Sequence, residues 1–230
     1  MSNAPAPLLA IFDHDGVLVD SFDFHQDAWL ELGRRTGLAI TLEFIHETFG
    51  MTNPSIFRRL LGDSLVEDDV RSYADLKELC YRELARGQID LIDGVPALLD
   101  GLTAAGVVLA IGSSAPRANL DLTVESCGLA NRFAAIASLE DIERGKPDPQ
   151  VFLVAAERAG VAPARAVVFE DAKVGIQAAK AAGMYAVGIT TTNPSQVLWD
   201  AGADEVVEHF RDFDVARLLR RLDSSRVCLF

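Results

Sequence analysis

The sequence predicts an α/β protein whose core is a parallel β-sheet with helices on both faces, and whose second part is an inserted all-helical domain. Two observations support this prediction. Short, continuous apolar segments alternate with longer segments of helical periodicity, which is typical of βαβ units. Residues 21–93, by contrast, show helical periodicity without a convincing strand, so they interrupt the alternation after the first apolar segment.

The apolar segments predict the strands of a Rossmann-like core, because they lack polar alternation, as expected for strands covered on both faces. They lie at residues 8–12, 107–111, 134–137, 166–169 and 185–189, with a shorter sixth strand at 205–207. The connecting helices are predicted at residues 95–105, 116–126, 149–159 and 174–182. A glycine follows each of these helices, where a left-handed cap is expected, at Gly106, Gly128, Gly160 and Gly183.

The interrupting segment is too long for an ordinary crossover loop and too regular for a linker. Its helices are predicted at residues 24–36, 42–49, 54–61 and 68–85. We therefore expect two domains, an α/β core formed by residues 1–20 and 94–230 and a helical domain formed by residues 21–93.

The composition limits the classes of partner. Half of the residues are hydrophobic and 24% are charged, which favours a folded protein with a sizeable core. The formal net charge of −13 argues against binding to nucleic acid or to an anionic membrane surface. The cysteines form no CxxC pair, and residues 1–7 lack the basic and apolar parts of a signal peptide. We therefore expect a cytoplasmic monomer or weak homodimer, without nucleic acid or membrane partners.

Polar residues follow several of the predicted strands. Because ligands bind outside the carboxyl ends of the strands in open parallel sheets, these residues are expected to converge at one edge. They are Asp13 and Asp15 after the first strand, Gly112, Ser113 and Ser114 after the second, Lys146 after the third, and Glu170 and Asp171 after the fourth.

This set of side chains suits phosphoryl transfer. Closely spaced carboxylates repel one another unless a cation lies between them, and a hard cation such as Mg²⁺ prefers oxygen ligands and also takes a phosphate oxygen. Asp13 is a candidate nucleophile that forms an aspartyl phosphate. Asp15 is a candidate acid that protonates the leaving oxygen and later deprotonates a water molecule.

The loop after the second strand is a candidate phosphate site. Ser113 and the adjacent backbone N–H groups of Gly112 and Ser114 are expected to bind phosphate oxygens at a helix N-terminus. Ser114 is also expected to cap the helix that follows Pro116. Lys146 would neutralise the charge that develops on the transferred group.

Four motifs in this order resemble those of the haloacid dehalogenase (HAD) superfamily, and the helical insertion resembles its C1-type cap domain. The likeness spans nearly the whole chain and is greatest to enzymes of the phosphoglycolate phosphatase and β-phosphoglucomutase types. The motifs are residues 13–21 (DHDGVLVDS), 112–114 (GSS), 145–149 (GKPDP) and 170–179 (EDAKVGIQAA).

The resemblance also implies the metal ligands and the nucleophile. It makes Asp13 the nucleophile and a ligand of Mg²⁺, with Asp15 contributing its backbone carbonyl, Asp171 its carboxylate and Glu170 a contact through water. His14 stands where the family more often has an apolar or aromatic residue, and its side chain is expected to point away from the nucleophile.

Residues of the helical domain are expected to select the substrate: His25, Gly50, Thr52, Asn53 and Lys77. In β-phosphoglucomutases the loop that corresponds to residues 49–54 carries an arginine that grips a second phosphate, and Asn53 stands there in this chain. This difference favours hydrolysis over isomerisation.

We therefore expect a Mg²⁺-dependent phosphoric monoester hydrolase that acts on a small phosphorylated metabolite. The alternative is a sugar-phosphate isomerase of the β-phosphoglucomutase type. A dehalogenase is disfavoured because it needs neither Asp15 nor the metal ligands. A binding protein without activity is disfavoured because every motif position carries a chemically competent residue.

Overall fold

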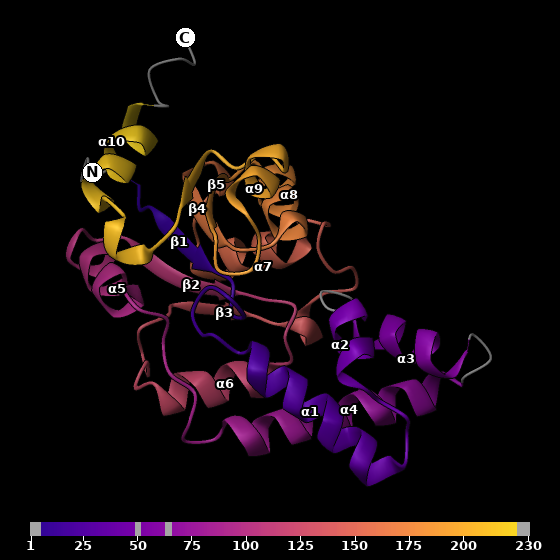
Figure 1. The fold of residues 1–230 in the computed structure, drawn as a ribbon. Helices are drawn as coiled ribbons and strands as arrows, with labels where there is room; N and C mark the ends of the chain where they lie inside the picture. The colour runs from indigo at the N-terminus through magenta and orange to yellow at the C-terminus, as the bar shows by residue number, and fades with distance from the viewer. Residues whose placement is uncertain (1–5, 49–51, 63–65, 225–230) are drawn as a thin grey trace. The chain divides into compact units, whose positions relative to one another are not determined.

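The structure, a computed structural model, describes residues 6–48, 52–62 and 66–224. The chain divides into two compact units (Figure 1). The larger unit comprises Met1–Asp20 and Asp90–Phe230, and the smaller comprises Ser21–Ile89, which lies within the predicted insertion. The role of the smaller unit as a cap stays a prediction.

A six-stranded parallel sheet forms the centre of the larger unit, with the strand order β3-β2-β1-β4-β5-β6. The strands are β1 (Leu9–Phe12), β2 (Val108–Gly112), β3 (Ala135–Ala137), β4 (Ala166–Glu170), β5 (Tyr185–Ile189) and β6 (Glu205–Val207). All six strands were predicted, and their arrangement confirms the α/β, Rossmann-like fold class.

The register of the sheet determines which strand ends meet. Phe12 at the end of β1 is paired with Ile111 of β2 on one side and with Phe169 of β4 on the other. The next backbone amide, that of Asp13, donates a 3.0 Å hydrogen bond to the carbonyl of Phe169. Asp13 therefore leaves the sheet directly beside Glu170.

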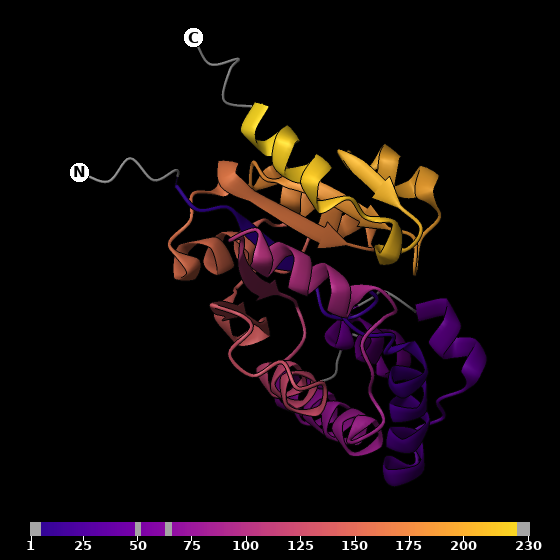
Figure 2. The same cartoon turned by 90° about the vertical axis from the view of Figure 1, so that its left-hand side faces the viewer.

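Helices cover both faces of this sheet. Figure 2 shows α5 and α10 on one face, with α7 and α8 on the other. The helices of the larger unit are α5 (Val95–Ala104), α6 (Arg117–Ser126), α7 (Gln150–Ala159), α8 (Lys173–Ala181), α9 (Ser195–Asp200) and α10 (Val215–Ser224). Three 3₁₀ turns complete it: η1 (Leu139–Asp141), η2 (Pro163–Arg165) and η3 (Phe210–Asp212).

The core explains why these strands are apolar throughout. All four residues of β1 are fully buried, and Leu9 and Ile11 pack with Phe152 of α7 and Val168 of β4 in one cluster. The hydrophobic effect of burying such side chains contributes about 1.5–3 kcal/mol each. This packing fixes the strands, and with them the polar residues that follow each strand.

The regular elements in the described part of the smaller unit are helices, as predicted. Its helices are α1 (Phe22–Thr36), α2 (Leu42–Thr48), α3 (Asn53–Leu61) and α4 (Glu67–Ala85). A separate apolar cluster holds them together, made of Trp29, Leu32, Ile45, Ile56, Phe57 and Val70.

The structure corrects one predicted cap and adds two helices. Ser114 does not cap α6: that helix begins at Arg117, whose backbone amide bonds to the Glu140 carboxylate at 2.9 Å, so η1 supplies the capping group. The helices α9 and α10 were not predicted. The four predicted helix-ending glycines all have positive φ, between 66° and 74°. Among the described residues, no helix combines the length and apolarity needed to cross a membrane.

Candidate active site

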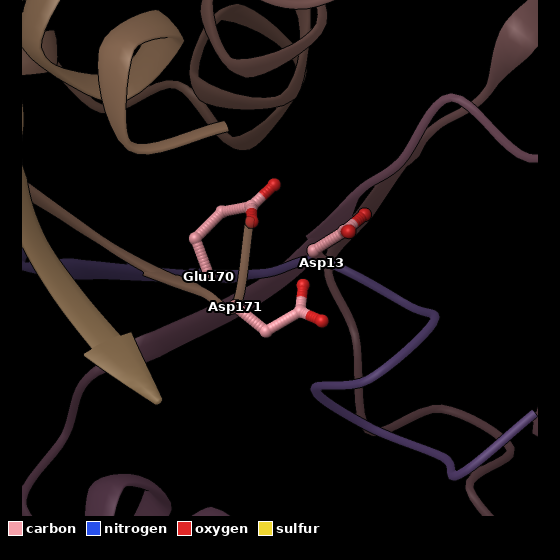
Figure 3. Close-up of side chains that lie close together, drawn as sticks. All are labelled: Asp13, Glu170 and Asp171. Atoms are coloured by element: carbon pink, nitrogen blue, oxygen red, sulfur yellow. The ribbon is translucent and has the colours of Figure 1, made fainter. Parts of the chain in front are cut away.

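Three carboxylates meet at the carboxyl ends of β1 and β4. Asp13, Glu170 and Asp171 each place an oxygen within 4.8 Å of the others' (Figure 3). The Glu170 side chain is fully buried, and those of the two aspartates are nearly so. The structure therefore brings together the acidic residues that the sequence placed after the first and fourth strands.

Lys146 joins this cluster from the loop between η1 and α7. Its Nζ lies 2.6 Å from Oε1 of Glu170 and 2.9 Å from Oδ1 of Asp13. The ammonium also sits 4.9 Å from the ring centre of Phe152, a cation–π contact that supports the buried side chain. Lys146 is thus in direct contact with the candidate nucleophile.

Burial and neighbouring charges shift the pKa values of Glu170, Asp171 and Lys146. Burial raises the pKa of Glu170, and Asp13 adds to this effect while Lys146 opposes it. Burial, together with the charges of Glu170 and Asp13, raises the pKa of Asp171 well above its ordinary value. Burial works against the charge of Lys146, but Asp13 and Glu170 outweigh it and raise the pKa of the ammonium.

The cluster fits a divalent cation. When all three carboxylates are ionised, the single ammonium of Lys146 leaves two negative charges uncompensated in a buried space. Oδ1 of Asp13 is buried and, although it is paired in charge with Lys146, has no hydrogen-bond partner of suitable geometry. Oxygen donors of this kind are the ligands that Mg²⁺ prefers. Asp13, Glu170 and Asp171 are therefore the side chains that would hold such an ion.

Two glycines make room for the carboxylates. Gly16 has a φ of +72°, and a Cβ there would lie 2.1 Å from Oδ2 of Asp171. A Cβ on Gly175, in the first turn of α8, would lie 1.7 Å from Oε1 of Glu170. Both distances are far shorter than any van der Waals contact, so any larger residue would displace a carboxylate of the cluster.

The loop after β2 presents Ser113 beside this cluster, because Gly112 follows the residue that pairs with the end of β1. The Ser113 side chain is buried, and its Oγ accepts a 3.2 Å hydrogen bond from the amide of Ala115. Its hydroxyl proton can therefore point to a bound anion. Ser114 is exposed, so only its backbone amide is a candidate for phosphate binding.

Asp15 lies beside the cluster but is not one of its three carboxylates. Its Oδ1 is 3.0 Å from Nδ1 of His14, whose ring is fully buried. No function was predicted for His14 from the sequence. The only signal was the residue type itself, an imidazole where the family more often has an apolar or aromatic side chain.

The loop after β5 also contacts the site, which was not predicted. Thr191 Oγ1 donates to the carbonyl of Gly16, and the Asn193 amide donates to the carbonyl of Asp171 at 3.1 Å. Thr191 therefore holds the backbone of the turn after β1, and Asn193 holds the backbone of the turn after β4. Their position directly after a predicted strand was the available signal.

Three of the predicted substrate residues of the smaller unit, His25, Asn53 and Lys77, form a partly buried polar group with Glu78. Lys77 Nζ lies 2.7 Å from His25 Nδ1 and 2.8 Å from Glu78 Oε1, and Asn53 Nδ2 donates to the same Glu78 oxygen at 2.8 Å. Thr52 is exposed and bonds to Ser55 at 2.9 Å.

Within this group, the pKa of Glu78 lies below its ordinary value. Burial alone would raise the pKa of Glu78, but the charges of Lys77 and His25, and hydrogen bonds from Lys77 and Asn53, lower it. The predicted residue Gly50 lies outside the described residues.

The fold and site define a parallel α/β enzyme with an acidic, lysine-bearing centre at the carboxyl ends of its strands. The sequence model of the haloacid dehalogenase-like hydrolase family matches residues 10–189. The chain belongs to this family and is a hydrolase of the HAD type, which confirms the resemblance found from the motifs.

Relatives of known activity include both candidate reaction types. The chain is 32% identical to validoxylamine A 7'-phosphate phosphatase of Streptomyces hygroscopicus subsp. limoneus, over 84% of this chain and 90% of the relative. It is 28% identical to β-phosphoglucomutase of Bacillus subtilis (strain 168), over 94% of this chain and 96% of the relative.

A solved structure confirms the fold. The crystal structure of a HAD hydrolase, family IA, variant 3, from Entamoeba histolytica HM-1:IMSS superposes with a TM-score of 0.85 at 24% identity. The match covers 94% of this chain and 99% of that chain.

Proposed function

We propose that this chain is a Mg²⁺-dependent phosphoric monoester hydrolase that acts on a small phosphorylated metabolite through an aspartyl phosphate on Asp13. The observation that carries the proposal is the meeting of Asp13, Glu170 and Asp171 within 4.8 Å, with Lys146 in contact with two of them. The phosphatase named among its relatives supports the same substrate class.

In the first step, a carboxylate oxygen of Asp13 attacks the phosphorus atom and the bond from phosphorus to the leaving oxygen breaks. The leaving oxygen takes the electron pair of that bond and a proton from the carboxylic acid of Asp15. Lys146 and the Ser113 hydroxyl stabilise the charge on the transferred phosphoryl oxygens.

In the second step, the Asp15 carboxylate takes a proton from a water molecule while the water oxygen attacks the phosphorus atom. The bond from phosphorus to Asp13 then breaks, its electron pair returns to the Asp13 carboxylate, and inorganic phosphate leaves. Asp15 is again protonated, and the enzyme is ready for another turnover.

Asp13, Glu170 and Asp171, with the backbone carbonyl of Asp15, would hold Mg²⁺. When bound, the ion would offset the repulsion between the carboxylates and an anionic substrate, and would polarise a phosphoryl oxygen.

The smaller unit supports hydrolysis over isomerisation. Asn53, which stands where mutases carry an arginine, donates its amide to Glu78. Glu78 also pairs with Lys77, whose side chain is only 3% exposed, so the charge of this lysine is compensated within the unit. This group therefore does not supply the strongly cationic grip that a second phosphate requires.

Substitution of the nucleophile tests the proposal. We expect Asp13→Asn, which is nearly isosteric, to lower Mg²⁺-dependent hydrolysis of 4-nitrophenyl phosphate by at least about a hundredfold, because the amide is a poor nucleophile. Asp121→Asn on the exposed face of α6 is the matched control and should retain activity. Circular dichroism checks the fold. Full activity in Asp13→Asn would remove Asp13 as the nucleophile.

Product analysis separates the two candidate reactions. With glucose 1-phosphate and a trace of glucose 1,6-bisphosphate, a phosphatase releases inorganic phosphate, whereas a mutase accumulates glucose 6-phosphate. A predominance of glucose 6-phosphate would replace the hydrolase by the isomerase.

A further inference from the structure

His14 is buried next to the candidate acid–base residue and is anchored at both ring nitrogens. Its ring is fully shielded from solvent, Nδ1 lies 3.0 Å from Oδ1 of Asp15, and Nε2 lies 2.7 Å from Oγ1 of Thr123. Thr123 belongs to α6, is itself fully buried, and lies 109 residues further along the chain. A buried imidazole is costly unless its polar atoms are bonded, and this pair of contacts meets that requirement.

The backbone holds the ring in this place. The carbonyl of His14 accepts hydrogen bonds from the amides of Leu18 at 2.9 Å and Val19 at 3.2 Å, and Gly16 donates to the carbonyl of Val19 at 2.8 Å. The turn after β1 is therefore held by hydrogen bonds within its own backbone. Its two successive side chains, those of His14 and Asp15, are brought into contact by the turn and not by a mobile loop.

The chemistry of the contacts assigns the protons. An ionised carboxylate only accepts hydrogen bonds, so a neutral His14 ring must carry its proton on Nδ1 to bond Asp15. Nε2 then accepts a hydrogen bond from the Thr123 hydroxyl, which has one proton to give. The Thr123 hydroxyl is therefore compatible with the tautomer of His14 that donates to Asp15.

The bond from His14 joins the Asp15 carboxyl, which is partly open to solvent, to the buried core. The Asp15 side chain is 36% exposed, whereas that of His14 is 0% exposed. A misplacement of a proton donor by about 1 Å can cost up to about a hundredfold in rate. The bond from the buried ring restricts the position of Oδ1 and with it that of the whole carboxyl group.

We propose that His14 is a positioning residue for the acid–base step, an inference that rests on the proposed function of Asp15. Nδ1–H of His14 occupies Oδ1 of Asp15, so Oδ2 is the oxygen that carries the proton to the leaving oxygen. The same Oδ2 later takes the proton from the attacking water. His14 neither gains nor loses a proton in either step.

Leaving-group dependence tests this role. Phenyl phosphate leaves poorly and needs the proton from Asp15, whereas 4-nitrophenyl phosphate leaves easily and needs it little. We expect His14→Leu to lower kcat/KM for phenyl phosphate about tenfold more than for 4-nitrophenyl phosphate, a fraction of what a general acid contributes. An equal loss on the two esters would overturn the proposal, because general damage to the fold acts on both.

A matched variant isolates the hydrogen bond. Asn and Leu have nearly the same shape, but the amide of Asn carries a donor at the place of Nδ1. Both variants remove the hydrogen bond between the His14 ring and the Thr123 hydroxyl, so the loss of that bond affects both variants equally. We expect His14→Asn to restore most of the discrimination that His14→Leu loses. Indistinguishable kinetics of the two variants would overturn the proposal.

A double-mutant cycle ties the effect to Asp15. In an Asp15→Asn background, His14→Leu should not change the ratio of the two kcat/KM values any further, because residues that act as a unit are non-additive. An additional loss of discrimination in that background would show that His14 acts through another group.

NMR of the wild-type protein tests the protonation of the His14 ring without relying on the folding of the His14 variants. In the wild-type protein, ¹⁵N NMR of labelled histidine should find His14 with a protonated Nδ1 and a bare Nε2, and Thr123→Val should perturb the Nε2 signal. A protonated Nε2 with a bare Nδ1 would overturn the proposal. Failure of the proposed function is separately visible, as absence of turnover of both esters by the wild-type enzyme with Mg²⁺, and the inference would fall with it.

Discussion

Glu170 reaches the acidic cluster through a space that only glycine leaves at position 175. The side chain is fully buried, bonds through Oε1 to Lys146 and through Oε2 to the amide of Ala172 at 2.7 Å. Both oxygens are therefore held by donors, and the orientation of Lys146 toward Asp13 depends on them. The absent Cβ of Gly175 is what allows the first turn of α8 to pass this close.

We expect Gly175→Ala to reduce activity on 4-nitrophenyl phosphate by at least about tenfold and to destabilise the protein. The added Cβ would lie 1.7 Å from Oε1 of Glu170, so the carboxylate must move and Lys146 loses one of its two carboxylate partners. Activity assays and urea denaturation measure the two effects.

Gly101→Ala is the matched control, because Gly101 is also helical but its added Cβ would meet only Val215 at an ordinary 3.5 Å. Since alanine is the better helix former, this variant should gain about 0.5–1 kcal/mol of stability and keep its activity. Similar behaviour of the two alanine variants would show that the space near Glu170 is not restricted.

At the scale of elements, the 3₁₀ turn η1 links the strand β3 to the helix α7. Asp141 accepts hydrogen bonds from the Ser138 amide and hydroxyl, both at 2.9 Å, and its two oxygens bond to Arg158 of α7. Arg158 also donates to the carbonyl of Ile136 at 2.6 Å. The loop that carries Lys146 begins directly after this brace.

Asp141 should make stability depend on pH. Hydrogen bonds from Arg158, opposed by burial and aided by Ser138, lower its pKa well below its ordinary value of 3.8. A lowered pKa stabilises the folded state above the ordinary value, and the contribution is lost as the pH falls toward the folded value. Because Arg158 is half exposed, we expect Asp141→Asn to cost about 1 kcal/mol at pH 7.

The difference in unfolding free energy between the wild type and Asp141→Asn should therefore be constant near neutral pH and shrink below about pH 4. Urea denaturation from pH 7 to pH 3 measures it. Asp121→Asn breaks a comparable pair with Arg117, but both side chains are at least half exposed, so this control should change little. A difference that grows in acid would contradict the assignment.

At the scale of the whole molecule, the three carboxylates of the acidic cluster repel one another when they are ionised, and a bound cation would relieve this repulsion. The chain carries a formal net charge of −13. Within the cluster, the ammonium of Lys146 is paired with Asp13 and Glu170. An ion that binds only the folded state stabilises it by linkage, by about 2.7 kcal/mol at a concentration one hundred times its Kd. For a chain of this size, such a gain corresponds to a rise in Tm of roughly 5–10 °C.

We expect Mg²⁺ to raise the Tm of the wild type by that amount, and EDTA to reverse it, in thermal melts followed by circular dichroism. Asp171→Asn should melt above the wild type without Mg²⁺, because it removes one of the repelling charges, and should no longer respond to the ion. Equal amounts of NaCl control for ionic strength. A full Mg²⁺ response in Asp171→Asn would show that the ion binds elsewhere.

The order of apolar and helical segments in the sequence was sufficient to predict the strands, the helical insertion and the carboxylates of the acidic cluster. The reason is physical: strands buried on both faces cannot alternate with polar residues, so the first polar residue marks where the sheet ends. Asp13 and Glu170 were found in this way, whereas Lys146 was found from the motif at residues 145–149. The helix α9 was missed because its segment has only six residues. The helix α10 was missed because it packs against α5, which is distant in sequence.

Only the tertiary structure decided which side chains meet. His14 and Thr123 are distant in sequence, and neither has a local signal for the other; packing of α6 brings them together. Thr191 and Asn193 likewise reach the aspartate turns because β5 lies next to β4 in the sheet. Local sequence determines where strands and turns form, since that depends on neighbouring residues. Contacts across strands and helices depend on how the core packs, which no local pattern encodes.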